Sequence, residues 1–331
     1  MARHPSILTN MAFRQSRVWS EAVTSICREA ESPDNLCPLR QAVRLFRRRS
    51  HYDVVVTMGP RPSLAYGLLC ALFRVPSRQI LTEVFLDSPR PGSPAWRLKT
   101  AWLRLAARRS YGVLTNSSGE VRLIADRLGL PDSRLRFVPM YSTIPDPGMR
   151  ETNDGSVVSI GRTLRDLDTL ARAARDIQAP IRIVAGGHDR VPDDLPENIR
   201  VLRDLPLDST YELLAKAAVV VLPLLPAERS TGQVVMFEAM AMGKPVVATR
   251  CIGTTDYIRH SENGWLVNPG DALGLAQAVN HLLRAPGEAR RLGKQALQDC
   301  LSQWMPDHHA SHKLQAVEDL SRPPLEDRST S

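Results

Sequence analysis

The stretch "ERSTGQVVMFEAMAMGKPVVAT", Glu228 to Thr249, predicts a helix followed by a buried strand. Its apolar run from Val234 to Met242 is closed by a glycine and a proline, which end helices, and "PVVAT" is typical of a strand. The run carries a single carboxylate, Glu238, and an ionised side chain in apolar surroundings is costly unless another group pairs with it. The sequence therefore raises the question of what Glu238 binds.

Short β-rich runs alternate with amphipathic segments along the rest of the chain. The predicted strands of the first half are Ile7–Thr9, Asp53–Met58, Gln79–Thr82, Gly112–Thr115 and Arg136–Pro139. Those of the second half are Val157–Ile160, Ile181–Ala185, Ile199–Leu202, Val219–Leu222 and Pro245–Ala248. This alternation predicts an α/β protein with parallel sheets. A stretch rich in Pro, Gly and polar residues, Val138–Ser156, separates the two series and indicates a domain boundary.

The bulk composition is that of an ordinary globular protein with two domains. The chain has 331 residues, of which 43% are hydrophobic and 24% charged. Its longest apolar stretches reach about half of the roughly 20 residues that span a bilayer, and its start lacks the apolar core of a secretory signal. We therefore expect a cytoplasmic protein. Five scattered cysteines show no spacing suited to zinc or to a disulfide framework, which predicts reduced thiols.

Positive charge is concentrated in the first half of the chain. Residues 1–150 contain 23 Lys/Arg against 11 Asp/Glu, a net charge of about +12, whereas the remainder carries about −4. Much of the excess lies in Arg40–Arg49 and in Trp96–Arg109, where Trp and Leu mix with Arg and Lys as on an interfacial helix. The alternative is a half-buried core helix whose arginines extend to solvent. If the segment is an interfacial helix, an anionic membrane surface is a partner of the protein. The chain shows no nucleic-acid recognition motif, so nucleic acid is not expected as a partner.

The loop before the predicted helix has the form of an anion site. In open parallel sheets, ligands bind beyond the carboxyl ends of the strands, where helix N-termini offer free N–H groups to phosphate. Ser230 or Thr231 can cap the helix, and Gly232 lets a ligand approach the backbone. Glu238 follows one to two turns later and can accept hydrogen bonds from two neighbouring hydroxyls, as on a ribose. The alternative is a buried ion pair with a purely structural role.

A second stretch, "VVSIGRTLRDLDTL", places two cations after another predicted strand. Gly161 ends the strand, and Arg162 and Arg165 come just before a helix that Asp166 or Asp168 could cap. Two cations in the same domain as the anion site suit a diphosphate leaving group, whose charge grows as a bond breaks. The alternative is that either arginine pairs with one of these aspartates on the surface.

Together these segments resemble the retaining glycosyltransferases of family 4. The matching landmarks of the second half are, in order, "SIGRTLRDLDTL", "IRIVAGG", "AAVVVLPL", "STGQVVMFEAMAMGKPVVAT", "GTTDYI" and "NGWLVNPGD". The first half matches more loosely, through "YDVVVTMGP", "GVLTNSSGEVRLIADRLGL" and "RFVPM". The resemblance implies the GT-B architecture, an α/β fold of two Rossmann-like parallel-sheet domains facing a central cleft.

The resemblance also implies roles for the matching residues. Glu238 matches the second Glu of the family's Glu-x7-Glu motif, which binds the donor ribose. Arg162 matches the arginine that contacts the donor diphosphate, and Arg165 falls near the family's lysine. Further donor-binding candidates are Gly161, Thr231, Gly232, Gln233 and Val234 near the phosphates, and Asp204 and Leu205, with Arg203, where the base usually rests.

One departure from the family motif falls at its first Glu, which touches the transferred sugar. This chain has Ser230 there, and Glu228 lies two residues earlier and could substitute if the loop bends. A serine hydroxyl can hydrogen-bond a sugar hydroxyl, but it supplies no negative charge beside a developing oxocarbenium ion. The departure motivates an alternative function, a catalytically silent GT-B subunit that binds nucleotide or partners an active transferase.

The first domain is expected to bind the acceptor. The segment "LTEVFLDSPRPGS" brings Glu83 and Asp87 toward the cleft, and Glu83 is the candidate for the polar group that relatives place near the reacting carbon. The alternative is a loop acid that caps the next helix. Gly59 and Arg61 are further cleft candidates. "HHASH", His308 to His312, is interpreted as a solvated helix start, and neither a metal nor another bound cofactor is assigned.

The resulting prediction is a retaining, hexosyltransferase-type enzyme. It moves a sugar from a nucleoside diphosphate sugar, UDP favoured over GDP, to a hydroxyl of a saccharide or lipid-linked saccharide in envelope or exopolysaccharide synthesis. The predicted domains are residues 1–145 for the acceptor and 146–303 for the donor. A helix at 304–321 could pack back on the first domain, and residues 322–331 are expected to be disordered.

Overall fold

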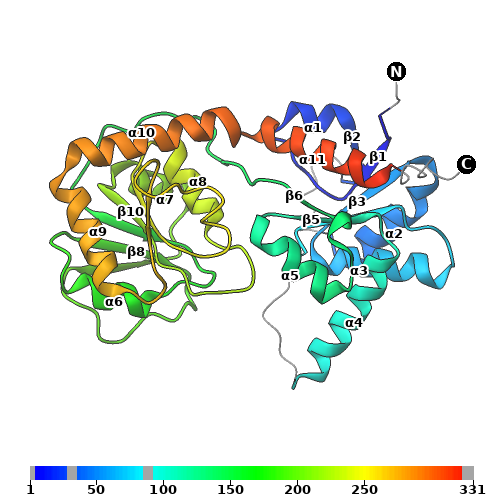
Figure 1. Cartoon of the computed structure of the whole chain (residues 1–331), viewed down its shortest axis with the longest axis horizontal. Helices are drawn as coiled ribbons and strands as arrows, with labels where there is room; N and C mark the ends of the chain where they lie inside the picture. The colour runs from blue at the N-terminus through cyan, green and yellow to red at the C-terminus, as the bar shows by residue number, and fades with distance from the viewer. Residues whose placement is uncertain (1–3, 28–35, 85–91, 323–331) are drawn as a thin grey trace, which may run out of the picture. The chain divides into compact units, whose positions relative to one another are not determined.

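The computed structural model describes residues 4–27, 36–84 and 92–322. The chain forms two compact units, of which unit 1 comprises the described residues up to Pro139 and those from His309 onward, and unit 2 runs from Met140 to His308. Each unit holds a six-stranded sheet (Figure 1). Every paired strand in both sheets is parallel. The predicted α/β class with two parallel sheets is confirmed.

Unit 1 has the strand order β2-β1-β3-β4-β5-β6. Its strands are β1 (Ile7–Thr9), β2 (Val23–Ser25), β3 (Val54–Met58), β4 (Gln79–Thr82), β5 (Gly112–Thr115) and β6 (Leu135–Phe137). Its helices are α1 (Arg17–Ala22), α2 (Pro38–Arg48), α3 (Pro60–Leu72), α4 (Pro94–Arg108) and α5 (Ser118–Leu128), with short 3-10 turns at Arg49–His51 and Asp132–Arg134. The last helix of the chain, α11 (Pro306–Ser321), lies beside α1 and β1, as Figure 1 shows.

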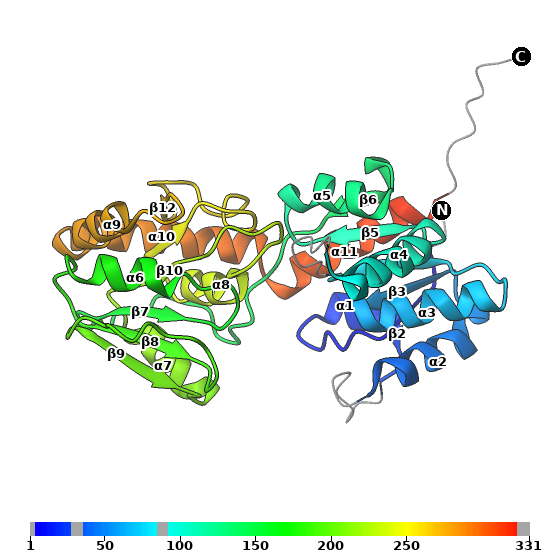
Figure 2. The same ribbon diagram turned by 90° about the horizontal axis from the view of Figure 1, so that it is seen from below.

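Unit 2 has the strand order β12-β11-β10-β7-β8-β9. Its strands are β7 (Val157–Ile160), β8 (Ile181–Ala185), β9 (Ile199–Arg203), β10 (Val219–Leu222), β11 (Val246–Thr249) and β12 (Trp265–Val267). Its helices are α6 (Leu167–Ala174), α7 (Leu207–Lys216), α8 (Gln233–Ala241), α9 (Ala272–Arg284) and α10 (Pro286–Gln303). Figure 2 shows β7, β8 and β9 side by side. The chain adds strands outward from β7 in one direction and then from β10 in the other, so the order switches between these two central strands.

The central strands read as continuous apolar runs because helices cover both faces of each sheet. Val54, Val55 and Val56 of β3 are fully buried, as are Val219 to Leu222 of β10. In unit 2, α6 and α9 contact each other, and α7, α8 and α10 form a second contacting group. Among the described residues, no helix has the length and apolar content needed to cross a membrane.

Two strands at the sheet edges were not predicted. β2 and β12 have three residues each and occupy the outermost positions of their sheets. The residues of β2 are half-buried or exposed, so the segment lacks the apolar run that marks a central strand. β12 follows Gly264, and its three residues are too few to show the alternation of apolar and polar residues that indicates a strand.

The ends of α8 and α6 show how the loops at the sheet edge are held. Gly243, with φ +66°, ends α8 in the left-handed conformation that glycine adopts readily, as predicted. At the other end neither Ser230 nor Thr231 caps the helix: Gly232 is the N-cap residue, with φ +78° and no side-chain cap. In α6, Asp166 is the cap, and its Oδ1 accepts a hydrogen bond from the Thr169 amide at 3.0 Å. The prediction of a Ser or Thr cap for α8 was therefore wrong, and a positive-φ glycine takes that place.

Candidate functional site

The candidate site of unit 2 lies at the carboxyl edge of its sheet. The arginine loop, residues 161–166, follows β7, and the glycine loop, residues 226–232, follows β10. These strands are neighbours in the sheet and form the switch point of the strand order. In open parallel sheets, ligands bind at such a point because the two loops leave the edge in different directions and open a crevice.

Arg165 folds back over a glycine that makes room for it. Gly161 has φ +123°, which strains any residue other than glycine, and the Arg165 guanidinium occupies the space that a Cβ atom at this position would need. The guanidinium donates from Nε to the carbonyl of Ile160 at 3.0 Å and from Nη1 to that of Thr163 at 2.9 Å. Burial lowers the pKa of Arg165 to about 10, partly offset by Cys251 and Asp189. Arg165 is still a cation at neutral pH, and no described residue hydrogen-bonds its Nη2.

Arg162 is the more exposed of the two cations. Its side chain is 67% exposed, and its Nη2 lies 3.4 Å from Oδ1 of Asp204. The same Asp204 oxygen accepts a hydrogen bond from the amide of Gly187 at 2.9 Å. An ion pair this exposed holds the arginine only weakly, so the guanidinium can exchange Asp204 for another anion.

The N-terminus of α8 is tied directly to the arginine loop. Thr231 donates from Oγ1 to the carbonyl of Thr163 at 3.2 Å, the same carbonyl that accepts from Arg165. Gly232 packs closely on Leu224, and the backbone of Leu224 forms an isolated antiparallel β-bridge with that of Arg165. Backbone N–H groups in the first turn of a helix have no carbonyl one turn earlier to bond, and they carry partial positive charge. The two stretches that the sequence singled out therefore form one positively charged edge.

Ser230 is buried, with 5% of its surface exposed, and packs against the backbone of Gly253. Glu228 is exposed. Val234, in the first turn of α8, exposes 48% of its surface, whereas Gln233 is buried. Leu205, in the loop after β9, is half-buried.

Glu238 is buried in unit 2, away from every Lys and Arg side chain that the structure describes. Only 5% of its surface is exposed, and no described Lys or Arg forms an ion pair with it. Its Oε1 accepts two hydrogen bonds, from Oγ1 of Thr143 at 3.1 Å and from the hydroxyl of Tyr211 at 3.3 Å. Burial raises the pKa of Glu238, and the two hydroxyls counteract part of that rise. Among the described residues, no cation forms the structural ion pair that the sequence left open, and two hydroxyl groups bond the carboxylate.

The remaining candidates belong to unit 1. Glu83 follows β4 with φ +54°, and Gly59, the N-cap of α3, donates its amide to the carbonyl of Thr82 at 3.0 Å. Arg61 is exposed in the first turn of α3. Asp87 lies outside the described residues.

The buried lysine of α11 is the partner of Glu83. Lys313 has no exposed surface, and its Nζ lies 3.9 Å from Oε1 of Glu83 and 5.8 Å from the centre of the Trp19 ring. Burial lowers the pKa of Lys313, partly offset by the Glu83 carboxylate. In the same helix His309 is buried, not solvated as predicted, and its Nδ1 lies 2.5 Å from the carbonyl of Pro139. Burial and the Lys313 charge hold the pKa of His309 well below its usual range.

Neither a metal cluster nor a disulfide appears in the described part of the chain. No three described His, Cys, Asp or Glu side chains are grouped as a metal would require, and the five cysteines form no disulfide.

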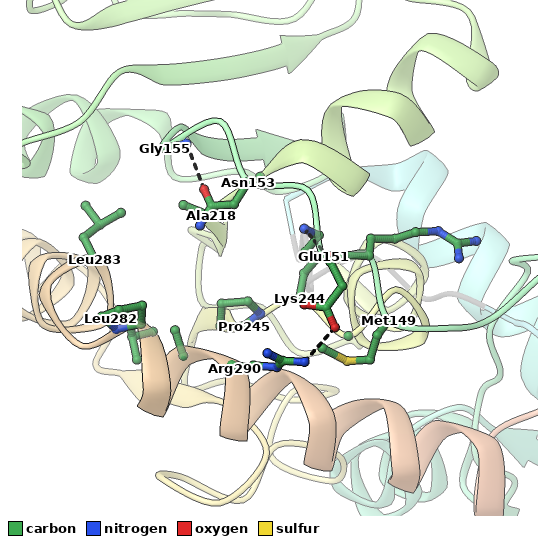
Figure 3. Close-up of a pocket in the computed structure, with 15 residues that line it drawn as sticks. Met149, Glu151, Asn153, Gly155, Ala218, Lys244, Pro245, Leu282, Leu283 and Arg290 are labelled. Atoms are coloured by element: carbon green, nitrogen blue, oxygen red, sulfur yellow. Dashed lines mark hydrogen bonds and ion pairs between the residues drawn. The ribbon is translucent and has the colours of Figure 1, made fainter.

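A cavity of about 260 Å³ in unit 2 lies at the opposite edge of the sheet (Figure 3). Its lining includes Gly155, Ala218 and Pro245, which precede β7, β10 and β11. It therefore sits at the amino ends of the strands and is distinct from the candidate site. Figure 3 also shows the ion pair between Arg290 and Glu151, 2.8 Å apart, at its rim.

Lys244, which lines this cavity, is expected to be a stability determinant. It is 3% exposed and donates from Nζ to the carbonyls of Arg150 at 2.9 Å and Thr152 at 2.8 Å. Lys244→Met leaves both carbonyls without a donor, so we expect the free energy of unfolding to fall by about 2–4 kcal/mol in urea titrations. Lys216→Met, at an exposed lysine of α7, should change it by less than about 0.5 kcal/mol.

The Lys244 prediction has a defined pH dependence. Burial lowers the pKa of Lys244 in the folded chain to about 8, from 10.5 for an ordinary lysine. Between these values the unfolded chain binds the additional proton, so the stability of the parent chain rises with pH in that window. The difference from Lys244→Met should therefore be larger at pH 9.5 than at pH 7. An equal or smaller difference at pH 9.5 would contradict this account.

Three residues that the sequence did not single out complete the site: Thr143, Thr163 and Tyr211. Thr143 lies in the segment before β7, and Tyr211 on α7, 95 and 27 residues from Glu238 in sequence. Neither belongs to a motif, and a hydroxyl on an amphipathic helix or in a polar loop carries no signal of its partner.

Two family models match the chain, one in each unit. The model described as "Glycosyl transferase 4-like domain" matches residues 12–140, and "Glycosyl transferases group 1" matches residues 155–285. The chain is 29% identical over 143 residues, 42% of its length and 37% of the relative's, to N-acetyl-alpha-D-glucosaminyl L-malate synthase of Bacillus anthracis. It is 27% identical over 279 residues, 74% of its length and 59% of the relative's, to D-inositol 3-phosphate glycosyltransferase of Acidothermus cellulolyticus. The matches thus cover less than two thirds of each relative.

Among solved structures, the chain is similar to Anabaena Alr3699/HepE in complex with UDP. The TM-score is 0.67 at 16% identity, and the match covers 94% of this chain and 99% of that one. This likeness shows the fold, which is GT-B. With the two family models it indicates a glycosyltransferase of the GT-B type.

Proposed function

We propose that this chain is a retaining glycosyltransferase that uses a nucleoside diphosphate sugar, UDP favoured over GDP, as its donor. The acceptor is a hydroxyl of a saccharide or of a lipid-linked saccharide, in envelope or exopolysaccharide synthesis. The HepE structure, solved with UDP, supports the choice of base. The resemblance of the Glu238 and Arg162 segments to family 4 supports retention.

The observation that carries the proposal is the joining of the arginine loop to the N-terminus of α8. Thr163 offers one carbonyl to both Arg165 and Thr231, so the guanidinium and the helix end are held together at the switch point. A diphosphate bound there meets the half-buried cation of Arg165, the exposed guanidinium of Arg162 and the first-turn amide groups of α8. These groups stabilise negative charge without a divalent ion.

We propose the following reaction at this site. The bond between the anomeric carbon and the diphosphate oxygen breaks, and its electrons pass to the diphosphate, where Arg162 and Arg165 stabilise the added charge. The acceptor hydroxyl attacks the anomeric carbon from the same face, and its proton passes to a departing phosphate oxygen. Glu238 binds the ribose of the donor, and Ser230 offers the sugar a hydroxyl where the family has a carboxylate.

The proposed acceptor side is unit 1. Glu83 lies at the carboxyl end of β4 with its side chain 27% exposed, and Nζ of the buried Lys313 lies 3.9 Å from its Oε1. Gly59 and Arg61 at the start of α3, and Asp87, are proposed to line the same acceptor site. A carboxylate fixed by a buried cation can orient an acceptor hydroxyl.

The proposal is tested by incubating the purified chain with UDP-, GDP-, ADP- and dTDP-sugars and measuring nucleoside diphosphate release. We expect release from one donor class, with loss in Arg165→Ala and Glu238→Gln. Nucleotide binding with no release, even with saccharide acceptors present, would instead favour a silent subunit, which the replacement of the first motif Glu by Ser230 would explain.

We further propose that unit 1 binds an anionic membrane surface through α2 and α4. One face of α4 is buried and contains Leu103, Ala106 and Ala107, so α4 is in part the half-buried core helix that the sequence left open as an alternative. Its other face exposes Leu98 at 59% and Trp102 at 41% among arginines and a lysine. Apolar side chains that stay exposed beside cations are typical of interfacial helices.

Trp102→Glu is expected to weaken binding to vesicles that contain anionic lipid in a co-sedimentation assay. The parent chain should bind these vesicles at low salt and be released at about 0.5 M salt, because screening removes the attraction. Leu273→Glu, at a 61% exposed leucine of α9, is the matched control and should bind as the parent does. Absence of salt-sensitive binding by the parent chain would contradict the proposed surface.

A further inference from the structure

We propose that Thr143 and Tyr211 are positioning residues for Glu238: their hydroxyls fix Oε1 and keep the carboxylate ionised, so that Oε2 alone receives the donor. This inference rests on the proposed function, since it concerns how the same acid binds its ligand. Neither hydroxyl is assigned contact with the donor.

The two carboxylate oxygens of Glu238 differ in their hydrogen-bond partners. Both hydroxyls donate to Oε1, at 3.1 Å from Thr143 and 3.3 Å from Tyr211. No described residue donates to Oε2. Oε2 is not among the described side-chain atoms that are fully buried without a partner, so it keeps some exposed surface although Glu238 as a whole is only 5% exposed. We therefore assign Oε2 to a single ribose hydroxyl, while Oε1 keeps its two internal partners.

The two hydroxyls also decide the charge of the acid. Burial favours the neutral form of a carboxyl group, and hydrogen bonds donated to it favour the charged form. No described cation contributes at Glu238, so Thr143 and Tyr211 are the groups that oppose the effect of burial on its pKa. Asp208, at the start of α7, is the other titratable group that acts on this cluster, through Tyr211. Loss of either hydroxyl removes one of the two groups that lower the pKa of Glu238, so the acid stays neutral up to a higher pH.

A neutral Glu238 would bind a ribose less well. An ionised carboxylate accepts a stronger hydrogen bond from a sugar hydroxyl than a carboxylic acid does. Thr143 and Tyr211 thus set the pH above which Glu238 is ionised and able to bind the ribose. Because Thr143 and Tyr211 come from separate elements, the segment before β7 and α7, they also fix the carboxylate's orientation relative to the α8 N-terminus.

The test compares the full-length parent chain with Tyr211→Phe, Thr143→Val and the double variant, each of which removes a hydroxyl at nearly constant volume. UDP affinity is measured by calorimetry from pH 5.5 to 8. We expect affinity near that of the parent at pH 8 and about tenfold weaker binding at pH 5.5, strongest in the double variant. Thr210→Val, on the same helix with its hydroxyl bonded to the carbonyl of Pro206, should keep the parent profile.

The Glu238 carboxyl is also titrated without ligand by carbon-13 NMR, with Glu238→Gln to assign its resonance. We expect a higher midpoint in each single variant and the highest in the double variant. Unchanged midpoints, or a loss of affinity that is equal at all pH values, would overturn the positioning role. If the parent chain binds no nucleoside diphosphate, the proposed function fails, while the NMR titration still decides whether the two hydroxyls tune the acid.

Discussion

Arg165→Ala is expected to lower kcat for sugar transfer by about 10²–10³-fold, the usual effect of removing one fixed donor from a group that gains charge in the transition state. The guanidinium is held against the Ile160 and Thr163 carbonyls over a glycine, so it is placed before the substrate arrives. A preorganised cation in a partly buried site needs no rearrangement as the diphosphate leaves. Steady-state kinetics with saturating donor measure the effect.

Arg175→Ala is the matched control for this prediction. Arg175 belongs to the same unit, is 61% exposed, and pairs with Asp194 at 2.6 Å beyond the end of α6. Its removal should leave kcat within about twofold, since exposed ion pairs contribute little. Equal effects of the two substitutions would show that charge in general, not the position of Arg165, supports activity.

Glu238→Gln is expected to weaken UDP binding by about 10–100-fold at pH 8, equivalent to the loss of a hydrogen bond to a charged group. The amide oxygen can still accept from Thr143 and Tyr211, which places the amide nitrogen where Oε2 stood. The variant thus keeps the internal contacts and removes the charge offered to the ribose.

Inorganic pyrophosphate separates this role from a general loss of structure. Because Glu238 is assigned to the ribose and not to the phosphates, pyrophosphate should bind Glu238→Gln as it binds the parent chain, whereas Arg165→Ala should lose it. A parallel loss of UDP and pyrophosphate binding in Glu238→Gln would contradict the assignment.

The sequence predicted the elements around the site because local patterns determine them. The buried runs of β7, β8 and β10 were placed with the bounds that the structure shows, since central parallel strands must be apolar on both faces. The edge strands β2 and β12 were missed because each has only three residues, and those of β2 also lack a buried apolar run. The α8 cap was wrong because Ser, Thr and Gly all favour that position, and only the backbone conformation of Gly232 distinguishes them.

The partners of the charged residues could not be predicted in the same way. Glu238 was singled out as a lone carboxylate in an apolar run, but its partners Thr143 and Tyr211 come from other elements and lie in no motif. Lys313 and Glu83 are 230 residues apart and meet because α11 lies in unit 1 with β4. Such pairs depend on tertiary packing, which a single sequence does not encode in any short pattern.

Calorimetric titration of the parent chain and of Arg165→Ala with UDP and with uridine tests most directly whether the joined arginine loop and α8 N-terminus form a diphosphate site. We expect the parent to bind UDP at least about 100-fold more tightly than uridine, and Arg165→Ala to lose most of that difference while its affinity for uridine stays unchanged. Equal affinities of the parent for UDP and uridine, with GDP, ADP and dTDP likewise no better than their nucleosides, would contradict it.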